Sequence, residues 1–137
     1  MFYLSLFFAT VVWGMNVIID KQALKTGHPI EVNFISTMTM AIVVMIYFWL
    51  ARKSGMSFSY SPQTISFSIL NGILVPTSFV AYLYALSKGD MNKVILVTAT
   101  SPIIAILFAV FAFNEQINAT QWFGILMTIL GIFLVMR

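Results

Sequence analysis

The sequence is poor in charged residues, and this absence decides its class. Charged residues make up 8% of the 137 positions, whereas hydrophobic residues make up 61%. A soluble domain carries roughly 25% charged residues and keeps them on its water-facing surface. So few charges cannot cover such a surface, so we expect lipid to be the solvent of this chain.

Cysteine is absent, and His28 is the only histidine. The chain therefore has no disulfide framework, no thiol nucleophile and no cysteine-based metal site. His28 stands in a Gly-His-Pro turn, and we interpret it as a solvated loop residue. The spans contain no phosphate-binding loop, no G-x-S-x-G motif and no paired carboxylates. We predict no enzyme activity, no bound metal and no cofactor.

The few charges stand between long uncharged stretches, which are Met1–Ile19, Val32–Ala51, Ser54–Ser87, Val94–Asn114 and Gln116–Met136. One charge at the bilayer centre costs about 2.5–3.5 kcal/mol on insertion scales. A helix needs about 20 apolar residues to cross the hydrocarbon. We predict transmembrane helices at Phe2–Leu24, Pro29–Ala51, Gln63–Ser87, Asn92–Phe113 and Thr120–Met136. Residues 1–137 then form a single all-α integral membrane domain of five helices, the first retained rather than cleaved as a signal peptide.

The basic residues give an orientation but no nucleic-acid site. They stand singly or in pairs at the ends of the spans, and they form no basic patch. Arg52 and Lys53 fall on one side of the membrane, and the other basic residues fall on the opposite side. Those others are Lys21, Lys25, Lys88, Lys93 and Arg137. The positive-inside rule predicts an outside N-terminus and an inside C-terminus in the cytoplasmic membrane. The difference in the number of basic residues between the two sides is modest, so a mixed orientation stays open.

Polar residues inside the spans are candidates for a substrate-binding cavity, because each needs a partner when lipid surrounds it. The candidates are Trp13 and Asn16 in the first helix, Asn71, Ser78 and Tyr82 in the third, and Thr98 and Ser101 in the fourth. The alternative is packing, since membrane hydroxyls often bond their own helix backbone. Asp20 shares the face of Trp13 and Asn16, but its place near a span end favours an interfacial role.

Pro76 and Pro102 interrupt two of the spans. Bent or broken helices are typical of transporters, because they expose backbone groups to a central cavity. Gly124, Thr128 and Gly131 lie on one face of the fifth helix and predict close helix packing. No span carries a carboxylate at mid-depth, which argues against a deeply buried carboxylate as a coupling group.

Several motifs together resemble one EamA-type domain of the drug/metabolite transporter superfamily. They are Trp13-Gly14-Met15-Asn16, the run Ala99–Ala105 around Pro102, Asn114-Glu115-Gln116 and Gln121-Trp122-Phe123-Gly124. The resemblance covers nearly the whole chain. It implies export or exchange of small solutes, drugs, metabolites and amino-acid-like compounds among them. It also implies that the candidate residues above face a central site, with Pro102 at a bend and Glu115 in a structural role.

The resemblance makes this domain one half of a ten-helix inverted-repeat architecture. A lone repeat cannot supply both walls of an alternating-access site, so it needs an inverted second copy. An antiparallel homodimer of dual topology, or a paralogous heterodimer, meets this need. The expected partners are a small-molecule substrate and membrane lipids, with no nucleic acid. Two alternatives stay open, a lipid-handling flippase subunit with a basic headgroup site at Lys21, Lys25 or Lys93, and a membrane subunit that only packs against a partner.

Overall fold

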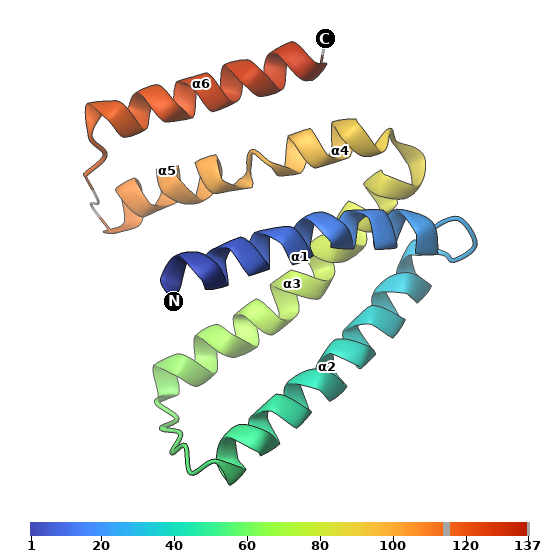
Figure 1. Ribbon diagram of the computed structural model, residues 1–137, viewed down its shortest axis with the longest axis vertical. Coiled ribbons are helices and arrows are strands. Elements are labelled where there is room, and N and C mark those ends of the chain that lie inside the picture. The colour runs from blue at the N-terminus through green and yellow to red at the C-terminus, as the bar shows by residue number, and fades with distance from the viewer. Residues whose placement is uncertain (114–115, 137) are drawn as a thin grey trace. The chain divides into compact units, whose positions relative to one another are not determined.

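The structure, a computed structural model, describes residues 1–113 and 116–136. Helices account for all regular structure in that range. They are α1 (Phe2–Ala23), α2 (Pro29–Lys53), α3 (Pro62–Lys88), α4 (Met91–Thr98), α5 (Ser101–Phe113) and α6 (Ala119–Met136). The chain divides into two compact units, Met1–Lys88 with α1 to α3 and Gly89–Arg137 with α4 to α6 (Figure 1). The predicted all-α class is confirmed.

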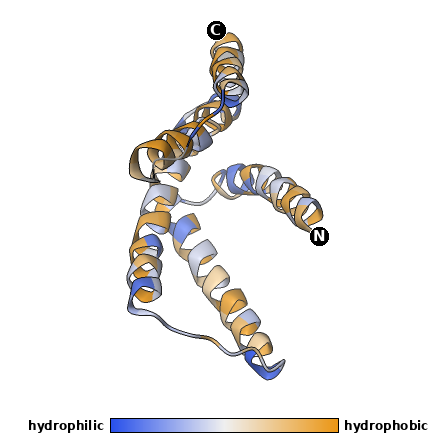
Figure 2. Cartoon of the chain, turned by 90° about the vertical axis from the view of Figure 1, so that its left-hand side faces the viewer, coloured by the Kyte–Doolittle hydropathy of each residue, from blue (hydrophilic) through white to orange (hydrophobic). Residues whose placement is uncertain are grey.

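Among the described residues, four segments are long and apolar enough to cross a membrane: Phe2–Ala23, Pro29–Lys53, Pro62–Lys88 and Met91–Ala112. The apolar helix Ala119–Leu134 is shorter and corresponds to the fifth predicted span. Figure 2 shows hydrophobic residues along the length of α1 and α2, with hydrophilic residues at the C-terminal end of α1 and at both ends of α2. Since most large apolar side chains of these helices are exposed, the surface suits lipid rather than water.

The helices of the first unit begin where the sequence supplies N-terminal signals. Pro29 and Pro62 occupy the first position of α2 and α3, where a missing N–H has no consequence. The ring nitrogen Nδ1 of His28 accepts from the Ile30 N–H, and Glu31 accepts from the His28 N–H, which completes a capping box. The expectation for His28 was incomplete, because this exposed residue also contacts the Tyr84 hydroxyl at 3.3 Å.

The three helices of the first unit converge at one end, where α1 turns into α2 (Figure 1). Leu83 and Leu86 of α3 are fully buried there, and Val32 of α2 is 8% exposed. The Lys21 ammonium donates to the Leu86 carbonyl oxygen at 2.6 Å, which joins the C-terminal ends of α1 and α3. The described core of this unit is therefore small and sits at one end of the three helices.

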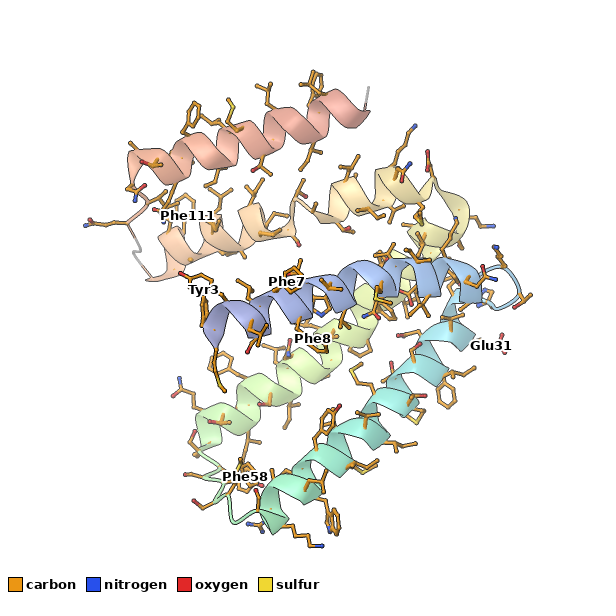
Figure 3. All side chains as sticks on the ribbon, viewed as in Figure 1. Tyr3, Phe7, Phe8, Glu31, Phe58 and Phe111 are labelled. Carbon is orange, nitrogen blue, oxygen red and sulfur yellow. The ribbon has the colours of Figure 1, made fainter. Side chains whose placement is uncertain are left out.

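The connection between α2 and α3 turns at Gly55, whose φ of +86° lies in the left-handed region that favours glycine. The Phe58 ring in this connection stacks on Phe48 of α2, with ring centroids 5.0 Å apart (Figure 3). Lys53 lies over the Trp49 ring at 5.2 Å. An aromatic and cationic cluster of this kind suits the membrane interface.

In the second unit the fourth predicted span consists of two helices rather than one. α4 ends at Thr98 and α5 begins at Ser101, because Pro102 has no N–H to offer the Thr98 carbonyl. The Thr98 side-chain hydroxyl donates to the Val94 and Ile95 carbonyls of its own helix. The predicted bend at Pro102 is therefore a complete break in the helix.

Helix α6 has a reciprocal cap. The Gln121 N–H donates to Asn118 Oδ1 at 2.8 Å, and the Asn118 N–H donates to Gln121 Oε1 at 2.9 Å. Ile125 is 8% exposed, and α4 contacts α6. The Thr128 hydroxyl donates to the Gly124 carbonyl of its own helix. Asn114, Glu115 and Arg137 lie outside the described residues.

Candidate functional site

A cavity of about 1090 Å³ lies among α1, α2 and α3 in the first unit. Small-molecule sites commonly measure roughly 300–1,000 Å³. The helices contribute Trp13, Asn16 and Asp20 from α1, Asn33, Ser36 and Thr37 from α2, and Ser68, Asn71, Gly72, Pro76, Phe79 and Tyr82 from α3, with apolar residues between them. A mixed lining of apolar and polar side chains is typical of a ligand cavity.

Four of the candidate residues line this cavity: Trp13, Asn16, Asn71 and Tyr82. Trp13 and Asn16 are three residues apart in α1, and they face the cavity together with Asp20. The Tyr82 ring stacks on the Phe79 ring, with centroids 5.6 Å apart and planes at 20°. The structure thus brings candidate residues from the first and third helices to one place.

Three other candidates do not line it. The Ser78 hydroxyl donates to the Val75 carbonyl at 2.9 Å, within its own helix. Thr98 and Ser101 belong to the second unit, where the Thr98 hydroxyl is also bonded to its own helix backbone. A substrate role for these three hydroxyl residues stays a prediction.

The sequence reasoning missed the α2 wall. Asn33, Ser36 and Thr37 stand at i, i+3 and i+4 and all line the cavity, together with Met40. This helical spacing of polar residues is the signal that was applied to the first and third helices. The second helix carries the same signal, and its spacing alone could have indicated this wall.

Asn33 is held by both ends of its amide. Its Nδ2 donates to the Pro76 carbonyl oxygen at 3.2 Å, and its Oδ1 accepts from the Thr37 hydroxyl at 3.4 Å. The first of these bonds joins α2 to α3 at the proline. The amide therefore fixes the spacing of two cavity walls.

Pro76 also changes the backbone one turn earlier. It has no N–H, so the Gly72 carbonyl loses its usual helical donor. Gly72 has no side chain, so it lines the cavity with backbone atoms. Gly72 and Pro76 thus both line the cavity at this turn of α3.

Asp20 is the only charged residue among those that line the cavity. Within the described part of the chain, no hydrogen bond or ion pair to its carboxylate is found. The Tyr82 hydroxyl oxygen is buried and has no hydrogen-bond partner among the described residues. The cavity thus presents one carboxylate and one unpaired hydroxyl, and no cationic side chain lines it.

A smaller cavity of about 450 Å³ lies in the second unit. Ala99, Pro102 and Ile103 line it at the break between α4 and α5, and Gly124 and Thr128 line it from α6. No charged side chain is among its described lining residues. Two of the three residues of the predicted packing stripe, Gly124 and Thr128, therefore border this smaller space.

The sequence profile of the EamA-like transporter family matches residues 1–137. An uncharacterized transporter of Pseudomonas aeruginosa is 21% identical over 126 residues, which cover 90% of this chain and 42% of that protein. An uncharacterized transporter of Archaeoglobus fulgidus is 24% identical over 124 residues, covering 89% of this chain and 42% of the relative. A third, from Synechocystis, is 32% identical over 54 residues, 39% of this chain and 16% of the relative.

These relatives are longer than this chain, which spans less than half the length of each. No solved structure matches the chain.

Proposed function

Because this chain belongs to the EamA-like transporter family, we propose that its first unit forms part of a binding site for a small solute that crosses the membrane. The observation that carries this proposal is the cavity of about 1090 Å³ among α1, α2 and α3. Amide, hydroxyl and aromatic groups from all three helices face it. Packing alone does not need such a space, because packed helices interdigitate their side chains.

Alternating access requires a second set of walls. We propose that an inverted copy supplies them, in an antiparallel homodimer or with a paralogous chain, in the cytoplasmic membrane. The length of the relatives supports this proposal. Each of the two is more than twice as long as this chain, so each has enough residues for a second set of helices around a central site. No catalytic set accompanies the cavity, so transport rather than chemistry is the proposed activity.

The flippase alternative is less well supported. It needs a basic headgroup site at Lys21, Lys25 or Lys93, and none of these residues lines either cavity. The Lys21 ammonium instead donates to the Leu86 carbonyl. The packing alternative predicts that the polar lining tolerates apolar replacement.

Two threonines of α2 provide a matched test. Thr37 lines the cavity, whereas Thr39 does not and bonds the Ile35 carbonyl of its own helix. We expect Thr37→Val to reduce solute flux about ten-fold through loss of one hydroxyl and of support for Asn33, while Thr39→Val retains it. The measurement is uptake into liposomes of a panel of amines, amino acids and sugars by purified protein.

Equal flux through the two threonine variants would mean that the cavity does not serve transport. Failure of the unmodified protein to move any member of the panel would rule out transport by a homodimer and leave only a heterodimer with a paralogous chain. Size-exclusion profiles of both variants control for folding.

A further inference from the structure

We propose that the cavity of the first unit selects organic cations, such as protonated amines, and that Asp20 is the residue that binds their charge. This inference rests on the proposed function, because it names the class of solute for the same site. The charge balance of the cavity leads to it. Asp20 is the only charged residue among those that line the cavity.

The surroundings of Asp20 leave its carboxylate available to a ligand. No described residue donates a hydrogen bond or pairs a cation to it. The nearest basic residue in sequence, Lys21, directs its ammonium to the Leu86 carbonyl, 2.6 Å away, and does not line the cavity. A carboxylate that is partly withdrawn from water gains most from a cation brought by the ligand.

The aromatic residues of the cavity fit the same class of ligand. Trp13 lies on the same α1 face as Asp20, seven residues earlier. Across the cavity, Phe79 and Tyr82 form a stacked pair with centroids 5.6 Å apart. Faces of Trp and Tyr attract an ammonium group through the ring quadrupole, and they also cover the apolar part of a ligand.

The remaining polar groups add acceptors. The Gly72 backbone lines the cavity, and Pro76 has no N–H to donate to the Gly72 carbonyl. The buried Tyr82 hydroxyl is unpartnered among the described residues and can accept from an N–H group. An ammonium group has three donors and no acceptor, so it complements this set.

The charge balance of the cavity lining disfavours the binding of amino acids. A zwitterion brings a carboxylate as well as an ammonium, and no Lys, Arg or His lines the cavity to pair with it. Placing this carboxylate in the cavity adds a second negative charge to that of Asp20. We therefore expect an amine to bind more tightly than the amino acid with the same side chain.

The test is a binding measurement on three matched compounds: phenethylamine, 2-phenylethanol and phenylalanine. The first has the ammonium alone, the second replaces it with a hydroxyl, and the third adds a carboxylate. Trp13 lines the cavity and serves as the fluorescent reporter once Trp49 and Trp122 are replaced by phenylalanine. We expect phenethylamine to bind about ten-fold more tightly, or better, than each of the other two.

The decisive variants are Asp20→Asn and Asp90→Asn. Asp90 caps α4 in the second unit by accepting from the Asn92 N–H, and asparagine can keep this cap. We expect Asp20→Asn to weaken phenethylamine binding about ten-fold or more, with little effect on 2-phenylethanol. Asp90→Asn should leave all three affinities unchanged, and Asp20→Glu should retain the preference for the amine.

Phenylalanine binding as tight as phenethylamine binding, or equal phenethylamine affinity before and after Asp20→Asn, would overturn the inference. If Asp20→Asn does not fold, the comparison of the three compounds on the parent protein still decides it. Liposome uptake separates the two proposals. If the amine binds but is not transported, the cation site is supported and transport by a homodimer is wrong. If neutral solutes are transported but the amine does not bind, the transport function is supported and the cation site is wrong.

Discussion

At the scale of single residues, the partner of each polar side chain separates packing from cavity lining. The hydroxyls of Thr10, Thr39 and Thr77 donate to carbonyls four residues earlier in their own helices. An asparagine amide carries two donors as well as an acceptor, and the Asn33 amide reaches the neighbouring helix α3. Hydroxyls are therefore weak indicators of a site in a membrane helix, and amides are stronger ones.

Two asparagines of the cavity wall should respond differently to the same change. Asn33 bridges α2 and α3 through the Pro76 carbonyl, whereas no side-chain hydrogen bond of Asn71 is found among the described residues. We expect Asn33→Leu to lower the free energy of unfolding by about 0.6–1.7 kcal/mol, the range of interhelical bonds in membranes. Asn71→Leu should cost nothing, since it exposes no orphaned group.

The measurement is unfolding by increasing fractions of denaturing detergent in mixed micelles, followed by circular dichroism. Equal stability of the two leucine variants would contradict the bridging role of Asn33.

At the scale of the elements, proline and glycine decide where the helices end and how closely they approach. Pro29 and Pro62 begin helices, while Pro102 separates α4 from α5. Pro76 stands inside α3, which stays helical on both sides of it. Position explains the difference, because a proline in the first turn loses no hydrogen bond and one in the interior always does.

Gly27 marks the closest approach in the turn between α1 and α2. A Cβ atom at this position would lie 3.0 Å from Val32 Cγ2 and 3.2 Å from the Ala23 carbonyl oxygen. We expect Gly27→Ala to destabilise the protein by about 1–3 kcal/mol, as overpacking typically does. Gly14→Ala is the control, because nothing lies within 4 Å of a Cβ there.

The two alanine variants are compared by thermal unfolding in the same detergent. A smaller loss of stability for Gly27→Ala than for Gly14→Ala would show that Val32 moves aside without cost.

At the scale of the whole molecule, function depends on how the chain is oriented in the membrane. α2 has 25 residues and spans about 37 Å at 1.5 Å per residue, which is long enough to place the two connections at its ends on opposite membrane faces. Lys21 and Lys25 stand near one end of α2, and Arg52 and Lys53 stand at the other. Basic residues at both ends reduce the difference in Lys and Arg between the two membrane faces, and the positive-inside rule depends on this difference.

The absence of cysteine allows a direct test of orientation. We propose Thr26→Cys and Ser57→Cys as single-thiol variants, since both positions are exposed and lie at opposite ends of α2. Gly27 is unsuitable because Val32 crowds it. An inverted homodimer predicts partial labelling of both variants by a membrane-impermeant thiol reagent on intact cells.

Labelling of Ser57→Cys alone would mean one fixed orientation with the N-terminus outside. The inverted homodimer would then be wrong, and a partner of opposite orientation would be required. Permeabilised cells, in which both thiols should react fully, control for accessibility.

The sequence alone determined the class and the helices, because the cost of burying charge in lipid fixes where spans begin and end. Each predicted span agrees with the structure within two residues at its described ends, apart from the break before Pro102. Trp13, Asn16, Asn71 and Tyr82, which helical spacing selects from the sequence, line one cavity, and their role in binding stays a prediction. Periodicity suffices for these, since a helix face follows directly from spacing.

Only the tertiary structure decided which faces meet. It brought Asn33 against Pro76 and placed Asp20, near the C-terminal end of α1, among the residues that line the cavity. It also showed that the Ser78 hydroxyl bonds its own helix. The physical reason is that spacing along one helix gives a direction around its axis, whereas the partner in that direction depends on how the helices pack.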